Sequence, residues 1–88
     1  MNNTTEMKKL SKRIVVEIFG DTYPLKTDDP EHLEKIAADV DALMKQTARR
    51  VNSFDGTKIA VLSALQLAEE YQQLKKDYDD LVELLNEK

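Results

Sequence analysis

The side chains of this chain that are suited to acid–base or metal chemistry do not form a convergent catalytic set. His32 is the only histidine, and no nucleophile or second base accompanies it. Asp77, Asp79 and Asp80 form an acidic cluster, but it lacks the glycine and the closing glutamate of a calcium loop. The sequence therefore predicts no catalytic residue, no metal site and no cofactor, and we expect a protein that is not an enzyme.

The basic residues Lys45, Arg49 and Arg50 form a second polar group, in a chain whose net charge is −4. Two interpretations of this basic cluster stay open. Near the end of a helix, the cations interact favourably with the helix dipole. On a surface, they form a positive patch that attracts an acidic protein. The acidic net charge argues against nucleic acid as the main partner, because nucleic-acid affinity rests largely on clustered lysine and arginine.

The composition narrows the class of protein. With 88 residues, two glycines, two prolines and 34% charged residues, the chain is typical of one ordered, helix-rich domain. It has no cysteine, which excludes disulfides. No apolar run is long enough to span a bilayer, and residues 1–12 lack the hydrophobic block of a signal peptide. We expect a cytoplasmic protein with no membrane partner.

The first element that must position the basic cluster is a predicted β-hairpin over about residues 13–27. The run Ile-Val-Val-Glu-Ile-Phe is rich in β-branched residues, which favour strands. Gly20-Asp21 is the predicted turn, since glycine readily takes a positive φ at the first central position. One face of this hairpin would carry the apolar residues Ile14, Val16, Ile18, Tyr23 and Leu25.

Pro24 leaves the hairpin register open. With Gly20-Asp21 as a two-residue loop, Ile18 faces Tyr23, and Pro24 opposes Glu17 at a hydrogen-bonded position. Proline has no N–H to donate there, so this pairing contains a defect. A longer loop or a bulge removes the conflict but changes the facing pairs.

A helix is predicted over about residues 30–51. Asp29 is suited to the N-cap and Pro30 to the first helical position. Apolar residues then recur at three- and four-residue spacing, as in an amphipathic helix with a broad core face. A loop over residues 52–56 ends this helix, and we expect its aromatic residue, Phe54, to fold back on the core.

The second helix is predicted to be too long for one compact domain. No helix breaker occurs from Thr57 to about Glu87, a stretch about 46 Å long as a helix. A compact domain of this size has a radius of gyration of only about 12 Å. The start of the helix is apolar on nearly all sides, and the remainder carries a heptad seam. That seam consists of Ala64, Leu67, Tyr71, Leu74, Tyr78, Leu81 and Leu85.

These patterns predict an α+β fold with an oligomeric rod. We expect a disordered tail over residues 1–11 and a small head over 12–68, made of the hairpin, the first helix and the start of the long helix. Residues 69–88 extend that helix as an oligomeric coiled coil. Tyrosine at two successive a positions is unusual for a plain two-stranded coil. The apolar stripe is also widened by Val61, Ala68, Val82 and Leu84, which suits a bundle of more than two helices, and both arrangements stay open.

Three segments in this order resemble the ZapA family of bacterial cell-division proteins. They are IFGDTYPL at the hairpin, DPEHLEKIAADVDALM in the first helix and KIAVLSALQLAEEYQQLKKDYDDL in the second. Each segment is weakly diagnostic by itself, and the three together at these distances are much more specific. The resemblance covers about residues 13–88.

The resemblance implies a function as well as a fold. It implies a head that dimerises, with coiled coils that join the dimers into homotetramers. It also implies binding to FtsZ, the tubulin-like division GTPase, and bundling of FtsZ filaments in the Z-ring at midcell. The family suggests a partner surface of charged head residues, which here are Lys45, Arg49, Arg50 and Asp21. Some relatives have a basic residue at the position of Asp21, so Asp21 ranks below the other three.

Other classes of protein share parts of this pattern. A ribbon–helix–helix DNA-binding protein also orders a strand before two helices, but its outward strand residues contact bases, and here Glu17 would be among them. A generic coiled-coil adaptor fits the periodicity equally well. A small helical enzyme with an interface active site would need a convergent polar cluster, which the sequence does not show.

Overall fold

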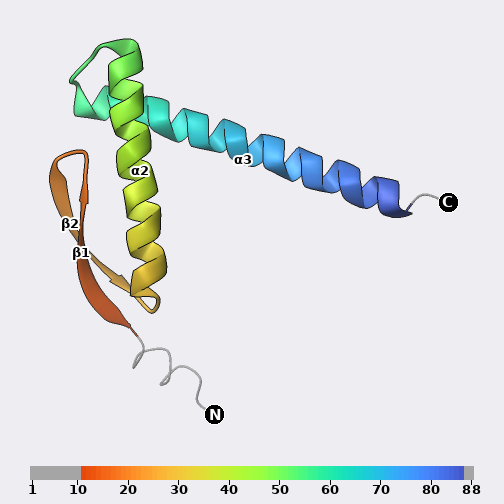
Figure 1. Ribbon diagram of the computed structural model, residues 1–88, viewed down its shortest axis with the longest axis horizontal. Coiled ribbons are helices and arrows are strands. Elements are labelled where there is room, and N and C mark those ends of the chain that lie inside the picture. Colours follow the sequence, from red (N-terminus) through yellow and green to blue (C-terminus); the bar gives the residue numbers. More distant parts are fainter. Residues whose placement is uncertain (1–10, 87–88) are drawn as a thin grey trace.

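The computed structural model describes residues 11–86, and it consists of a hairpin, a helix and a long projecting helix (Figure 1). The strands are β1 (Lys12–Ile18) and β2 (Asp21–Thr27), and the helices are α2 (Pro30–Val51) and α3 (Gly56–Asn86). The predicted fold class is confirmed. Apart from Ser11, the predicted tail over residues 1–11 lies outside the described residues.

The hairpin turn lies one residue earlier than the sequence predicts. Phe19 and Gly20 form its centre, with φ values of 52° and 87°, and Ile18 pairs with Asp21 across it. Two successive positive φ values are typical of a type I′ turn. The predicted turn at Gly20-Asp21 is therefore wrong. Phenylalanine rarely adopts a positive φ, so its residue type does not identify Phe19 as a turn residue.

This register resolves the conflict at Pro24. Val16 pairs with Tyr23, and Val15 pairs with Pro24. Counting outward from the hydrogen-bonded pair at the turn, Pro24 occupies a non-hydrogen-bonded position, where no ladder bond needs its N–H. The register differs from the predicted one by two residues. Because side chains alternate with a period of two, the predicted apolar face is unchanged.

Helix α2 begins and ends where the sequence predicts. Asp29 is its N-cap, and its Oδ1 accepts a hydrogen bond from the N–H of His32 at 3.2 Å. At the other end, Asn52 takes the left-handed conformation and its N–H donates to the carbonyl oxygen of Ala48. The face of α2 that packs on the hairpin contributes to a small core. The buried apolar residues of that core are Val16, Ala37, Met44 and Ile59.

The loop between the helices is held by its own polar side chains. Ser53 Oγ accepts a hydrogen bond from the N–H of Asp55 at 3.1 Å. Asp55 Oδ1 in turn caps α3 by accepting from the N–H groups of Thr57 and Lys58. These bonds leave Phe54 pointing outward with 94% of its surface exposed. The prediction that Phe54 anchors the core is wrong, because the hydrogen bonds of Ser53 and Asp55 determine the conformation of this loop.

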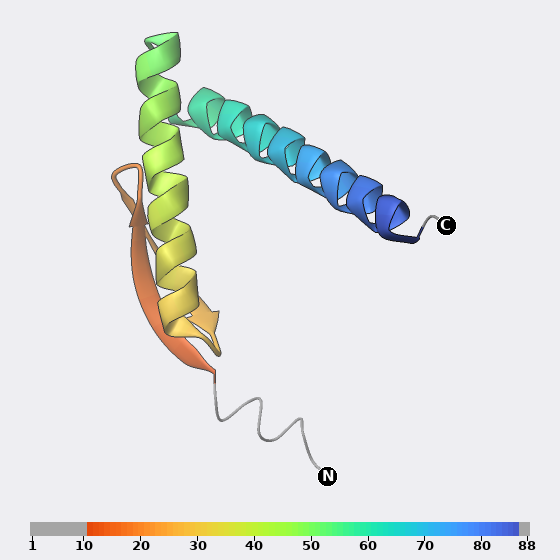
Figure 2. The same ribbon diagram turned by 45° about the vertical axis from the view of Figure 1, so that its right-hand side comes forward.

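Only the N-terminal part of helix α3 lies beside the head, and the remainder of the helix projects into solvent (Figures 1 and 2). Among the described residues, Ile59 and Ser63 are the only buried positions of this 31-residue helix. The radius of gyration is 17.9 Å, well above the value of about 12 Å expected for a compact chain of this length. The single chain is therefore far from compact, and most of α3 has no packing partner within it.

Candidate self-association surface and basic cluster

All seven residues of the predicted heptad seam are exposed on α3. Leu74 is 67% exposed and Leu85 is 76% exposed, although both are large and apolar. Residues spaced by three and four fall on one side of a helix, so these side chains form a continuous stripe. A contiguous apolar surface of this kind is typical of an interface between proteins.

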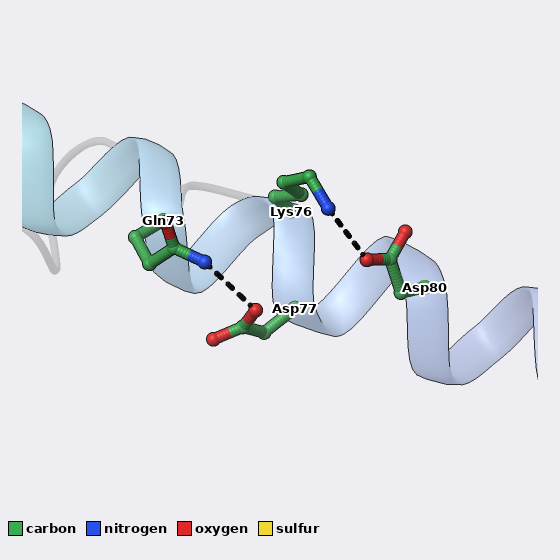
Figure 3. Close-up of polar contacts among 4 residues, drawn as sticks. All are labelled: Gln73, Lys76, Asp77 and Asp80. Atoms are coloured by element: carbon green, nitrogen blue, oxygen red, sulfur yellow. Dashed lines mark hydrogen bonds and ion pairs between the residues drawn. The ribbon is translucent and has the colours of Figure 1, made fainter.

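Outside the seam, α3 carries polar pairs between residues one turn apart, two of which are drawn in Figure 3. Gln73 Nε2 donates to Asp77 Oδ1 at 3.0 Å, and Lys76 Nζ contacts Asp80 Oδ2 at 2.9 Å. Each carboxylate of the acidic cluster thus pairs with a residue one turn earlier on the helix, outside the seam. Within residues 11–86, no group of three potential ligands could hold a metal ion.

Near the head, the apolar surface widens beyond the seam. Val61 is 55% exposed and Leu65 is 62% exposed, and these two residues, four apart on one face of the helix, lie outside the seam. The sequence predicts a start of α3 that is buried on nearly all sides. In the single chain only Ile59 and Ser63 meet that expectation, since α2 covers just one side of α3. The remaining apolar side chains are available to a second chain.

The basic cluster is divided between two faces of α2. Lys45 forms an ion pair with Asp41, with Nζ and Oδ2 2.9 Å apart. Arg50 points toward α3, where its Nη2 donates to Gln66 Oε1 at 3.2 Å. Lys45 and Arg49 are four residues apart and share a face. The three residues therefore do not form a single patch, and Arg49 is the one with no ion pair or hydrogen bond among residues 11–86.

Asp41 links the basic cluster to the hairpin turn. Its Oδ1 accepts a hydrogen bond from the N–H of Phe19 at 2.7 Å, while its Oδ2 pairs with Lys45. The hydrogen bond from Lys45 and then that from Phe19 lower the pKa of the Asp41 carboxyl below its ordinary value of 3.8. The hydrogen bond from the N–H of Phe19 to Asp41 holds the turn, with its positive φ at Phe19, against α2. Lys45 thereby lies at the same end of the head as Asp21, which directly follows the turn.

Asp41 did not emerge from the sequence as a candidate. Its spacing of four from Lys45 was the only local signal, and such pairs are common on helix surfaces. The contact with Phe19 spans 22 residues and depends on the tertiary fold.

A groove of about 720 Å³ lies between the hairpin, α2 and the start of α3. Its walls are largely apolar and include Tyr23, Leu25, Met44, Ala60 and Val61. Tyr23 and Leu25 are 43% and 38% exposed, so the inner face of β2 is only partly covered by this chain. The sequence indicated the apolar face of the hairpin but not that α2 leaves part of it open.

The fold and the exposed seam of α3 define a class of protein. In this class, a small α+β head is joined to a helical rod whose apolar side is uncovered in one chain. Comparison with known proteins agrees with this class. The family model described as cell division protein ZapA matches residues 14–88. The chain belongs to the ZapA family of cell-division proteins, which gives it a role in cell division.

Individual relatives match most of the chain. It is 36% identical over 75 residues to the cell division protein ZapA of Shouchella clausii, covering 84% of this chain and 96% of that protein. It is 40% identical over 70 residues to the ZapA of Geobacillus thermodenitrificans, covering 78% of this chain and 77% of that protein.

A solved structure has the same fold. It is described as a ZapA mutant dimer from Geobacillus stearothermophilus and is 36% identical in sequence, with a TM-score of 0.68. The similarity covers 88% of this chain and 91% of that one. The dimeric state of that relative supports self-association of the present chain. Among residues 11–86, no helix is both long and apolar enough to cross a membrane.

Proposed function

We propose that this protein binds FtsZ filaments with its heads and crosslinks them through its α3 rods, promoting Z-ring assembly at midcell in the cytoplasm. The observation that carries the proposal is the uncovered heptad stripe on α3, in a member of a cell-division family. The role is one of binding and assembly, with no catalysis and no cofactor.

The mechanism depends on the number of binding sites held together. Pairing of rods covers the stripe and joins two heads, and pairing of dimers into a homotetramer places heads at both ends. Once one head is bound to a filament, the others experience a high effective concentration of filament sites. Weak single contacts then become strong crosslinks. We propose residues 12–68 as the head that binds and residues 69–88 as the extension that joins heads.

The basic cluster supplies the proposed contact with FtsZ. Arg49 is the leading candidate, because its charge is not engaged within the described part of the chain. Lys45 and Arg50 contribute charge but already have the intramolecular partners Asp41 and Gln66. Asp21 lies beside the turn and has the opposite charge, so it stays the weakest candidate. The positive charge of Arg49, on the face of α2 that it shares with Lys45, favours an acidic partner segment and speeds its encounter.

The test is charge reversal measured by co-sedimentation with FtsZ. Arg49→Glu should weaken co-sedimentation and filament bundling while leaving the oligomer unchanged in the ultracentrifuge. Lys35→Glu makes the same charge change at an exposed position of α2 outside the cluster, and it should behave like the wild type. Equal loss in both variants would indicate that only total charge matters. Full retention of binding by Arg49→Glu and by Lys45→Glu would remove the basic cluster from the interface.

Absence of FtsZ binding by the wild-type protein, with self-association intact, would instead favour the generic coiled-coil adaptor. Light scattering of FtsZ filaments with and without the protein makes this distinction, because an adaptor without FtsZ specificity leaves the scattering unchanged.

A further inference from the structure

The groove between the hairpin and α3 is an incomplete part of the head. Met44 forms part of its lining and is almost fully buried, whereas Tyr23 and Leu25 on the hairpin side are partly exposed. Ala60 and Val61 line the side that belongs to α3. The groove is largely apolar, is open to solvent and has a volume of about 720 Å³. Transfer of an apolar side chain from water into it would therefore lower the free energy.

The loop before α3 presents such a side chain. Phe54 is 94% exposed, more than any other large apolar residue among residues 11–86. Its neighbours Ser53 and Asp55 are joined by a hydrogen bond, and Asp55 also caps α3. Phe54 is therefore held outward on an ordered loop, so little conformational entropy is lost when it enters a binding site.

The position of Phe54 relative to the groove suggests how both are covered. Asp55, the next residue, belongs to the groove lining, so the exposed ring and the open groove are neighbours on the same chain. In a two-fold symmetric dimer, a residue of one chain that contacts a site on the other receives the same contact in return. A symmetry axis close to this loop would bring each Phe54 to the groove of the opposite chain.

We propose that Phe54 of each chain fills the groove of a second copy of this chain, so that both heads are completed only in the pair. The groove is continuous with the exposed apolar surface of α3, because Val61 contributes to both. That surface points to a second copy as the occupant, and the solved relative with this fold is a dimer. The inference rests on the self-association part of the proposed function and not on FtsZ binding.

A single tryptophan tests the proposal directly. The chain has no tryptophan, so Phe54→Trp places the only indole at the proposed contact. At concentrations where sedimentation shows dimers, its emission should be blue-shifted, and on dilution it should shift to the red along the same dissociation curve. Solvent-exposed emission in the dimer would overturn the proposal. Blue-shifted emission that is independent of concentration would do so too, since the ring would then fill the groove of its own chain.

Two further variants test the groove and the ring separately. Ala60→Glu introduces a charge into the groove and should shift the emission of the Phe54→Trp protein to the red, whereas Ala38→Glu, at an exposed site on α2, should not. Phe54→Ala should raise the dimer dissociation constant by about 10-fold or more, as for a buried aromatic at an interface. Because Phe54 has almost no contacts within one chain, this change should leave the fold of the head intact.

A dimer unaffected by Phe54→Ala would contradict the proposal. If the same variant lost FtsZ binding while its dimer was unchanged, the ring would belong to the FtsZ contact and the proposal would again be wrong. The dimer dissociation constant is measured in the absence of FtsZ, and FtsZ binding is measured in a separate experiment. Failure of the self-association contact is therefore distinguishable from failure of FtsZ binding.

Discussion

The head and the rod of this molecule obtain their stability from different sources. In the head, β1, β2 and α2 pack on one another and bury Val16, Ala37 and Met44 within one chain. In the rod, residues of α3 beyond Ser63 are exposed or only partly covered, and its leucines face solvent. The comparison indicates that the core of the head is formed by contacts within the chain, whereas the rod requires a second copy to cover its apolar side.

Helix propensity does not remove this requirement. Isolated helices are marginally stable in water, and most helical stability in proteins comes from packing of the apolar face. The pairs that α3 makes by itself, such as Lys75 with Asp79 and Lys76 with Asp80, are exposed and contribute little. By contrast, burying one leucine side chain contributes about 1.5–3 kcal/mol. The heptad seam is therefore the main stabilising element of the rod.

Among the substitutions proposed here, the largest loss of stability is expected when charge is placed in the seam, where it should weaken the oligomer. Leu74→Glu combined with Leu81→Glu removes two leucines per chain that pairing of the rods would bury, and it introduces carboxylates that repel across that interface. The dissociation constant measured by sedimentation should rise by at least about 100-fold, given the burial energy of two leucines per chain. Gln72→Glu, on the outer side of the same helix, should have no such effect. Equal oligomer stability in the two proteins would contradict the conclusion that the rod, unlike the core of the head, depends on a second copy.

The second effect concerns the backbone of the hairpin turn. Gly20→Ala places a Cβ on a residue with φ of 87°, and the cost is conformational because no atom lies within 4 Å of the added carbon. We expect a loss of about 1–2 kcal/mol in the free energy of unfolding. Gly56→Ala, at the start of α3 with equally open space, should be neutral or slightly stabilising. Urea denaturation at one fixed protein concentration measures both, and a stable Gly20→Ala variant would contradict the assigned turn.

A smaller effect is expected at the link between the turn and α2. Asp41→Asn weakens the hydrogen bond from Phe19 and removes the ion pair with Lys45. The pKa of Asp41 is lowered by folding, so its contribution is fully present above the ordinary value of 3.8 and is lost as the pH falls through the lowered value. The difference in Tm between wild type and Asp41→Asn should therefore be constant near neutral pH and shrink in acid. A difference that persists unchanged at low pH would exclude the carboxylate as its source.

The smallest effect is expected on the polar side of the rod. Lys76→Ala and Asp80→Ala remove an exposed pair on the side of α3 away from the seam. Oligomer mass and Tm should remain within experimental error of the wild type. A clear loss of oligomer in either variant would show that this side also belongs to an interface, which would sharpen the description of the rod as a bundle.

Much of this molecule was predictable from local sequence. The Asp29-Pro30 start of α2 follows from capping and from the fixed φ of proline. The seven-residue spacing of Leu67, Leu74 and Leu81 follows from helix geometry, and it predicted which side of α3 is apolar. These features depend on residues close together in the chain, so they can be derived without a tertiary fold.

The remaining features depend on contacts that no local pattern contains. Phe19 occupies a turn position that its own propensity disfavours, and the bond from its N–H to Asp41 is formed across 22 residues. Phe54 was expected in the core because it is aromatic, but the polar residues beside it decide where it points. The division of the basic cluster likewise depends on Gln66, which lies on another helix.

Sedimentation velocity of the wild-type protein over a wide concentration range is the most direct test of the central claim. The account predicts dimers, or a multiple of two copies, wherever α3 is fully helical by circular dichroism. It also predicts that helix content falls as dilution separates the copies. A single-chain species that keeps its full helix content at high concentration would contradict it, because the apolar side of α3 would then be stable in water without a partner.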